Sequence, residues 1–262
     1  MPNTARQILV FLLTLNLVGC GDLFSLYKEE EIPTRIQQVL EKTYHVHSSV
    51  RVVEQTLWVY IPLPFSLLKA SPIQQKRLRD IFNDATYTTS RILWNSKNKD
   101  LKFYAIVIAD ITSGFILYTI GQVEDLKKYY FERISIDEFS KRKIFDKTLA
   151  LEIIGDKEGK TFPYFNISMP NFLAALISQR AKGEIDSDIK IDWDTTSMDN
   201  QKYMFSFYLP SDKGKYISIL KREIKSVLRA YNFKDKLSHV TITTPFRTLS
   251  LLKEDIFGPE KK

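Results

Sequence analysis

Hydrophobic residues along this chain recur at two spacings, one typical of helices and one typical of strands, and the two alternate. The longest helical pattern covers residues 72–94, and Ser71 with Pro72 suits an N-cap followed by a first helical turn. Residues 102–111 are apolar on both faces, as expected of a strand at the centre of a sheet. In the first half of the chain we therefore predict helices over 33–43 and 72–94, and strands over 50–61, 102–111 and 115–120.

The second half of the chain repeats this order of elements. The segments 57–62 and 204–210 occupy equivalent places, since each is strand-like, ends at a proline and precedes a long helical pattern. Residues 121–165, between the two copies, have a helical and then an irregular pattern. The second copy is predicted to contain helices over 170–182 and 215–231 and strands over 189–193, 202–209, 239–244 and 246–252.

These elements predict an α+β fold of two similar small modules. Each module should have helices packed on one face of a mixed or antiparallel sheet, because the apolar face of a sheet must be buried against another layer. The predicted division is a signal segment 1–19, a tether 20–31, a module 32–125, a connector 126–165, a second module 166–257 and a tail 258–262.

The first twenty residues combine a basic residue, a short apolar run and a small-residue motif. Arg6 precedes the apolar run 8–18, which is too short to span a bilayer, since a helical span takes about 20 apolar residues. The run ends in the sequence Leu-Val-Gly-Cys at 17–20. This segment resembles the signal peptide and lipobox of bacterial lipoproteins. The resemblance implies cleavage between Gly19 and Cys20, a diacylglyceryl group on the Cys20 thiol and an acyl chain such as palmitate on its new amino group.

The resemblance also implies a location in the bacterial cell envelope, because two or more acyl chains on Cys20 would hold the protein stably on a membrane. An acidic residue directly after the cysteine retains such proteins in the inner membrane of some bacteria, and here Asp22 stands one place later. We therefore expect the periplasmic side of the outer membrane in preference to the inner membrane. Three alternatives stay open: Cys20 as an ordinary buried residue behind an ordinary signal peptide, an uncleaved signal anchor, or the first helix of a cytosolic protein.

Composition and charge narrow the range of partners. Hydrophobic residues form 44% of the chain and aromatic residues 13%, which is enough for a packed core, and the lone cysteine excludes an intramolecular disulfide. The formal net charge is +7, but cations are interspersed with acids except at Lys127-Lys128 and at 141–143. These clusters predict either a solvated basic surface or attraction to anionic lipid head groups or an acidic partner. The chain has no recognisable nucleic-acid-binding module, so we expect no nucleic-acid partner.

Two groups of residues have the chemistry of a metal site without its usual spacing. His45 and His47 point the same way if the chain is extended there, and two imidazoles can begin a metal site. Asp192, Asp194 and two earlier aspartates stand at alternate positions, so a strand would place their carboxylates on one face. Carboxylates gathered in this way could bind calcium. The alternatives are ordinary loop histidines and a solvated acidic face that discourages edge pairing. We name these four residues as weak candidate ligands and expect no cofactor.

The sequence offers little support for catalysis. Residues 155–161 have the composition of a phosphate-binding loop but one residue too few between the glycines, and Pro163 stands where a helix should begin. We therefore predict a glycine turn there. Nucleophilic hydrolysis needs an activated serine or cysteine, and no Gly-x-Ser-x-Gly motif occurs. Only geometry could identify a pair of catalytic carboxylates, so no catalytic residue is named.

Three functional hypotheses follow. The first is a non-enzymatic, envelope-anchored lipoprotein that docks or scaffolds another envelope protein or complex. The second is a lipoprotein that binds a small molecule, a lipid or a glycan in the cleft between the modules, because junctions between domains are favoured positions for pockets. The third is a carboxylate-dependent hydrolase of envelope polymers. A large apolar patch or exposed sheet edge would favour the first, a deep apolar pocket the second, and two facing acids in a wet cleft the third.

Overall fold

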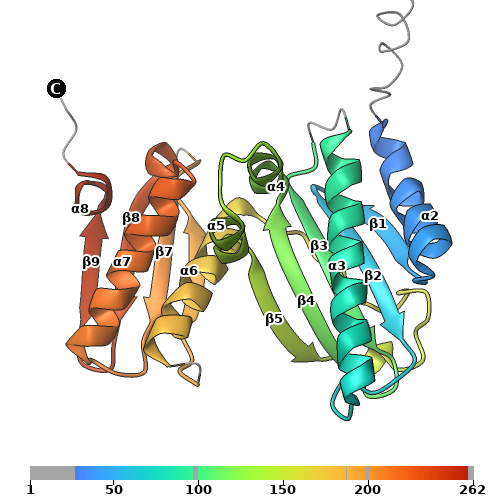
Figure 1. Ribbon diagram of the computed structural model, residues 1–262. Helices are drawn as coiled ribbons and strands as arrows, with labels where there is room; N and C mark the ends of the chain where they lie inside the picture. The colour runs from blue at the N-terminus through green and yellow to red at the C-terminus, as the bar shows by residue number, and fades with distance from the viewer. Residues whose placement is uncertain (1–26, 97–99, 187, 199–200, 259–262) are drawn as a thin grey trace, which may run out of the picture.

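The computed structural model describes residues 27–96, 100–186, 188–198 and 201–258, and within these ranges the protein has an α+β fold (Figure 1). It contains two mixed sheets, one of five strands and one of four, and helices pack on each sheet. The predicted fold class of two similar modules is confirmed. The predicted lipidation site Cys20 and cleavage residue Gly19 lie outside the described residues.

Module 1 is built around the five-stranded sheet, whose order is β1-β2-β3-β4-β5. The strands β2 and β3 are parallel and the other neighbouring pairs are antiparallel. A short 3-10 helix at Glu29–Glu31 leads into the module. Its elements are α2 (Ile32–Tyr44), β1 (Ser49–Val53), β2 (Thr56–Leu63), α3 (Pro72–Trp94), β3 (Phe103–Asp110), β4 (Phe115–Gln122), α4 (Val123–Tyr130), α5 (Ile136–Lys141) and β5 (Ile144–Leu149).

Module 2 repeats the topology of the first seven of these elements. Its strand order is β6-β7-β8-β9, and its central pair β7 and β8 is again parallel because a helix crosses over between the two strands. In both modules a short helix follows the last strand of the repeat directly. The elements are α6 (Met169–Ile185), β6 (Asp192–Ser197), β7 (Tyr203–Tyr208), α7 (Gly214–Ala230), β8 (Leu237–Thr243), β9 (Thr248–Leu252) and α8 (Lys253–Phe257).

Local sequence signals located most of these elements. Helix α3 has the predicted bounds, and the Ser71 side chain caps it by accepting a hydrogen bond from the backbone N–H of Gln74. The predicted strand 50–61 is instead a hairpin of β1 and β2, because the chain turns at Glu54 with φ 49°. The predicted strand 189–193 is also displaced, since β6 begins only at Asp192.

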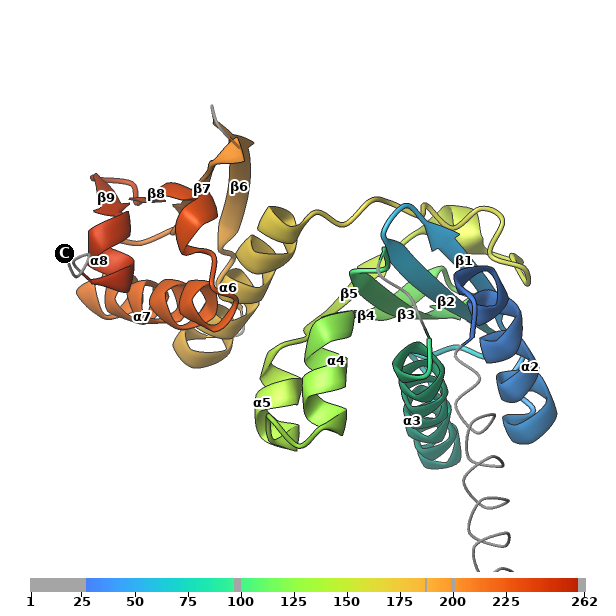
Figure 2. The same ribbon diagram turned by 90° about the horizontal axis from the view of Figure 1, so that it is seen from above.

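The segment 126–165, expected to be a connector, contributes a strand and a covering layer to module 1. Strand β5 pairs antiparallel with β4 and extends the sheet. Its residues beyond Ile144 are exposed, so the strand lacks the alternating apolar pattern that would have revealed it. Residues 150–168 then cross the face of the sheet opposite the helices (Figure 2). There Phe162 packs against Trp58 and Tyr60.

The two modules share one hydrophobic core, which fixes their relative position. Phe103 of β3 lies against Phe172 of α6 with ring centroids 5.3 Å apart, and Phe172 contacts Tyr231 at 5.9 Å. Beside these rings, the buried Asp125 carboxylate of α4 accepts hydrogen bonds from Arg142 at 2.8 Å and from the Tyr231 hydroxyl of module 2. We call Asp125, Arg142 and Tyr231 the Asp125 cluster.

A second buried carboxylate, Asp110 at the end of β3, gives a prediction on pH. Burial acts to raise the pKa of Asp110, but hydrogen bonds from Ser113, Thr112 and the Leu67 backbone N–H hold it at about 2, below the ordinary 3.8. Because the folded-state pKa is lowered, Asp110 stabilises the fold above pH 3.8 and this stabilisation is lost as the pH falls toward about 2. We expect the loss to be about 2 kcal/mol.

The measurement is the unfolding free energy of the wild-type protein and of Asp110→Asn between neutral pH and pH values near 2. The variant is expected to be less stable at neutral pH, and the difference between the two proteins should shrink as the pH falls. Comparing the two proteins removes the contribution of other acids, which titrate in both. A difference that stays constant with pH would contradict the prediction.

Candidate functional site

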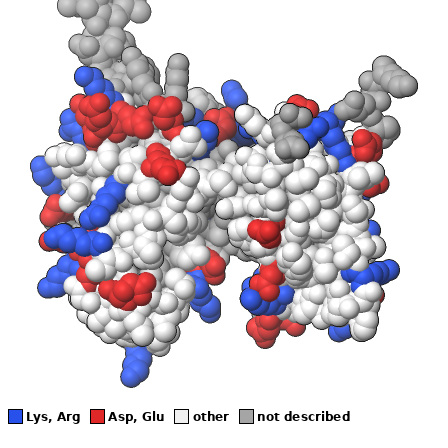
Figure 3. All heavy atoms as spheres, turned by 180° about the vertical axis from the view of Figure 1, so that it is seen from behind, with Lys and Arg blue, Asp and Glu red and all other residues white. Residues whose placement is uncertain are grey.

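A cleft of about 550 Å³ lies between the modules and is the candidate functional site. Module 1 contributes side chains of β4 and β5 to it, and module 2 contributes α6 and β6. The residues 165–167 that join the modules close a third side. Seen from behind, the molecule is notched between its two lobes (Figure 3). Phe165 at the cleft is 47% exposed, so the site is an open groove and not a sealed pocket.

On the side of module 1, the cleft is lined by a hydrogen-bonded tyrosine–aspartate pair and by two buried apolar side chains. Tyr118 of β4 is directly opposite Asp146 of β5, and its hydroxyl donates a hydrogen bond to Asp146 Oδ2 at 3.1 Å. Burial and the nearby Asp146 charge raise the pKa of Tyr118 to about 12, so the phenol stays protonated at neutral pH. The buried side chains of Ile120 and Ile144 lie beside this pair.

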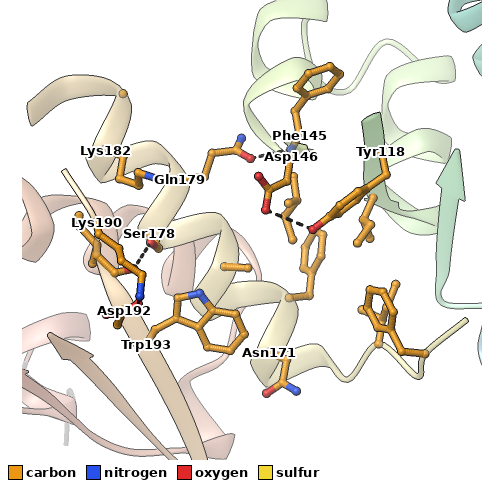
Figure 4. Close-up of a pocket in the computed structure, with 18 of the residues that line it drawn as sticks. Tyr118, Phe145, Asp146, Asn171, Ser178, Gln179, Lys182, Lys190, Asp192 and Trp193 are labelled. Atoms are coloured by element: carbon orange, nitrogen blue, oxygen red, sulfur yellow. Dashed lines mark hydrogen bonds and ion pairs between the residues drawn. The ribbon is translucent and has the colours of Figure 1, made fainter. Parts of the chain in front are cut away.

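The wall from module 2 carries an indole and several polar groups. Trp193 of β6 is half-buried, and its ring faces the Tyr118–Asp146 pair across the cleft (Figure 4). On the neighbouring helix α6, Ser178 donates a hydrogen bond to the backbone oxygen of Ile191 at 2.9 Å, which ties α6 to the start of β6. The indole is therefore held on a fixed support.

The free edge of β5 borders the same cleft. The backbone N–H of Phe145 donates to the Gln179 side chain at 2.6 Å, and the Gln179 amide donates to the Lys143 oxygen at 3.0 Å. These bonds show that the Phe145 backbone faces away from β4, and the alternation of an antiparallel strand directs Lys147 and Leu149 the same way. Gln179 thus covers the edge at Phe145, and the next outward-facing N–H, that of Lys147, donates to the Asp146 side chain at 2.8 Å.

The acids at the cleft are already engaged with neighbouring groups. Asp146 accepts hydrogen bonds from Tyr118 and from the backbone N–H of Lys147, and Asp192 forms an ion pair with Lys190 at 2.9 Å. The described residues contain no group of three or more histidine, cysteine, aspartate or glutamate side chains that could hold a metal ion. The cleft therefore offers apolar contact and hydrogen-bonding groups for binding.

The structure does not bring the four predicted metal ligands together. His45 ends α2 in the left-handed conformation with φ 54°, and His47 follows in the loop of module 1, both of them exposed. Asp192 and Asp194 lie on β6 of module 2, where they share the predicted face on either side of Trp193. Asp192 reaches the cleft, whereas the two earlier aspartates of the predicted series precede the strand.

The glycine loop at 155–161 is the predicted turn. The Asp156 side chain accepts hydrogen bonds from the backbone N–H groups of Glu158, Lys160 and Thr161. These donors are used within the loop, so they do not form a cradle for a phosphate. Gly159, at φ +64°, packs against Tyr60 so closely that a Cβ atom would come within 2.8 Å of the ring.

Sequence reasoning missed the residues that form the cleft. Tyr118, Asp146, Gln179 and Trp193 come from four separate elements, and each has the ordinary character of its own strand or helix. Trp193 is one apolar residue of the predicted strand 189–193, and Gln179 is one polar residue of the predicted helix 170–182. No local signal marks them, because their proximity arises from the packing of one module on the other.

Comparisons with known proteins complete the description of the site. Among the described residues, no helix has the length and apolar character needed to cross a membrane. No protein family model matches the chain, and no curated protein matches it. Among solved structures, the chain is similar to the crystal structure of the sex pheromone staph-cAM373 precursor, with 8% sequence identity and a TM-score of 0.25 over 79% of this chain and 71% of that one.

Proposed function

We propose that the protein is a non-enzymatic lipoprotein, anchored in the bacterial cell envelope, that docks another envelope protein by holding an extended segment of it between the two modules. The observation that carries this proposal is the open cleft between the modules, which lies beside the edge strand β5. A peptide can add to such an edge as a further strand, with affinity from main-chain hydrogen bonds and specificity from side-chain pockets.

The side chains around the cleft suit this role. Trp193, Phe165 and Tyr118 are aromatic groups at the open surface or partly buried below it, and aromatic residues are enriched at the centres of protein interfaces. On the opposite face of β5 from Asp146, Phe145 and Leu149 leave further apolar surface exposed, at 55% and 60%. A long exposed edge strand is a liability in a free protein, which supports a partner for it.

The shared core favours a preformed site. Phe172 and the Asp125 cluster hold the modules together, so the cleft does not need to be assembled when a partner arrives. Preorganisation of this kind lowers the entropic cost of binding. The lipid at Cys20 would hold the protein at the membrane, where envelope proteins are concentrated.

A small molecule, a lipid or a glycan in the same cleft is the second candidate. The observation that favours it is the combination of the Trp193 ring with the polar side chains of Asp146 and Asn171, since pockets for small ligands pair apolar walls with a few placed polar groups. The hydrolase hypothesis has less support, because Asp146 and Asp192 are each engaged by a neighbour.

Site-specific photo-crosslinking tests the proposal. A photoreactive phenylalanine derivative is placed at position 165 and the cells are irradiated. We expect the protein to become crosslinked to a partner protein, and sequencing of the crosslinked peptide identifies the bound segment. The same probe at position 246 should give no such crosslink, because Phe246 is 84% exposed in the β8–β9 turn, at the other edge of the sheet from β6, and does not line the cleft. A synthetic peptide of the captured segment should then bind the purified protein, and Trp193→Ala should weaken it about tenfold or more.

A proline variant separates the two candidate functions. Lys147→Pro removes an outward-facing N–H of β5, which donates to Asp146 in the free protein and which an added strand would take over. Proline is tolerated on an edge strand at such a position. Peptide binding should be lost in this variant, whereas binding of a small ligand beside Trp193 should persist. Two results would contradict strand addition. One is a crosslink from position 165 to a molecule that is not a protein, and the other is peptide binding that persists in Lys147→Pro. The matched control for Trp193→Ala is Asp194→Ala, because Asp194 lies on the same strand as Trp193 but is exposed.

A further inference from the structure

Exposed aromatic rings gather where the C-terminal ends of α3 and α4 meet. Trp94 of α3 stacks on Tyr130 of α4 with ring centroids 5.9 Å apart, and it meets Phe131 edge-on at 6.2 Å. Trp94 remains 37% exposed and Phe131 56% exposed. Tyr87, two helical turns before Trp94 on the same stripe of α3, is 52% exposed. We call Tyr87, Trp94, Tyr130 and Phe131 the aromatic patch.

The aromatic patch lies at the point where the N-terminal segment joins the fold. The backbone N–H of Tyr27, the first described residue, donates to the oxygen of Asn95 at 3.0 Å, and Tyr27 forms a bridge with Ser96. Asn95 and Ser96 directly follow Trp94. In Figure 1 the start of α2, the end of α3 and α4 all lie at the top of module 1.

The length of the tether limits how far this end can be from a membrane. Cys20 and Tyr27 are seven residues apart, and a fully extended chain of that length spans at most about 25 Å. Helix α3, with its 23 residues, is about 35 Å long. A lipid on Cys20 therefore keeps the Trp94 end of α3 near the bilayer, while the Pro72 end can lie beyond the reach of the tether.

The chemistry of the aromatic patch fits the interfacial region of a bilayer. Tryptophan and tyrosine prefer this region because an apolar ring and a polar tip can each find a suitable environment there. Arg133, whose guanidinium lies 5.7 Å from the Phe131 ring, and Arg91, whose charge acts on Tyr130, flank the rings and can reach lipid phosphates. The acids Glu29–Glu31 at the same end offset these cations, so the rings must supply most of the attraction.

We propose that the aromatic patch lies in the interfacial region of the bilayer that holds the Cys20 lipid, so that module 1 stands on the membrane by the Trp94 end of α3. This inference rests on the lipid anchor of the proposed function. It orients the molecule, because the rings and the anchor together define which end of the sheet is membrane-proximal. A single point of attachment at Cys20 would leave that orientation free.

A depth measurement tests the inference on the lipidated full-length protein. Lipidation occupies the thiol of Cys20, so an engineered cysteine can be labelled selectively with a fluorophore, at Lys127→Cys beside the patch or at Phe246→Cys in module 2. The protein is reconstituted into vesicles of phosphatidylethanolamine and phosphatidylglycerol that contain nitroxide-labelled lipids. We expect strong quenching of the label at position 127 and no quenching of the label at position 246. The quenching at position 127 should persist at high salt.

Replacement of the rings provides the decisive comparison. Trp94→Ser combined with Phe131→Ser should abolish quenching at position 127 while the protein still floats with the vesicles. Trp94→Tyr combined with Phe131→Trp should retain the quenching, and equal thermal melting curves show that both variants fold. Quenching that is unchanged by the serine variant, that disappears at high salt or that is equal at both positions overturns the inference.

The same experiment separates this inference from the proposed function. Protein that floats with the vesicles but shows no quenching at position 127 contradicts only the orientation. Protein without lipid on Cys20, which fails to float, contradicts the anchor of the proposed function and this inference with it.

Discussion

Asp125→Ala is expected to destabilise the protein by about 3–5 kcal/mol, the cost of leaving a buried charge without its partner. The Asp125 side chain is 2% exposed and that of Arg142 11% exposed, so water cannot replace the lost carboxylate. Arg142 would retain the Glu138 carboxylate and the face of the Tyr231 ring, and the Tyr231 hydroxyl would lose its acceptor. Burial and the Asp125 charge raise the pKa of Tyr231, which keeps its hydroxyl a donor in the wild-type protein. Urea-induced unfolding measures the loss.

Two further variants make this prediction specific. Tyr231→Phe removes one donor and leaves the Asp125–Arg142 ion pair, so it should cost less, about 1–3 kcal/mol. Asp194→Ala removes an exposed carboxylate of module 2 and should leave the unfolding curve unchanged. If Asp125→Ala is no more destabilising than Asp194→Ala, the Asp125 cluster does not join the modules. Because the cluster spans both modules, Asp125→Ala should also weaken peptide binding in the cleft.

Cys20→Ala is expected to abolish lipid attachment and to release the protein from the membrane fraction. The predicted acyl chains each contribute about 0.8 kcal/mol per buried CH₂ group to membrane binding. No helix among the described residues is long and apolar enough to span a membrane. The measurement is incorporation of labelled palmitate, together with fractionation of the cell envelope. The aromatic patch alone should be too weak to retain the variant.

A neighbouring variant serves as the control for this prediction. Ser25→Ala lies in the same predicted tether and should keep both labelling and membrane association. Unchanged labelling of Cys20→Ala would exclude the lipoprotein interpretation and favour an ordinary signal peptide or a signal anchor. Separation of inner from outer membranes in the same experiment tests the expected location, which depends on the position of Asp22.

Helices and central strands were predictable to the extent that their signals are local. Ser71 and Pro72 predicted the start of α3. The continuous apolar run of β3 predicted a central strand, and this strand is buried at every position. Strand β5 was not predictable, because its residues after Ile144 face solvent and carry no period of two. The start of β6 was misplaced because the apolar positions before Asp192 imitate a strand although the chain turns there.

The candidate site was predictable only in its general position. A cleft between the modules was expected from the domain organisation, but Tyr118, Asp146, Gln179 and Trp193 could not be named. Asp125 is an instructive case, since an acid in the first turn of a helix is usually explained by the helix dipole and exposed to water. Here the second module covers it and makes it a buried partner of Tyr231.

By itself, the sequence determined the α+β class, the repeated order of elements and the most distinctive N-terminal motif, because these depend on residues close together in the chain. The tertiary structure alone decided the fifth strand, the shared core, the Asp125 cluster, the cleft and the meeting of the aromatic patch with Tyr27. Each of these depends on contacts between distant segments, and their energies come from burial that no single segment can achieve alone.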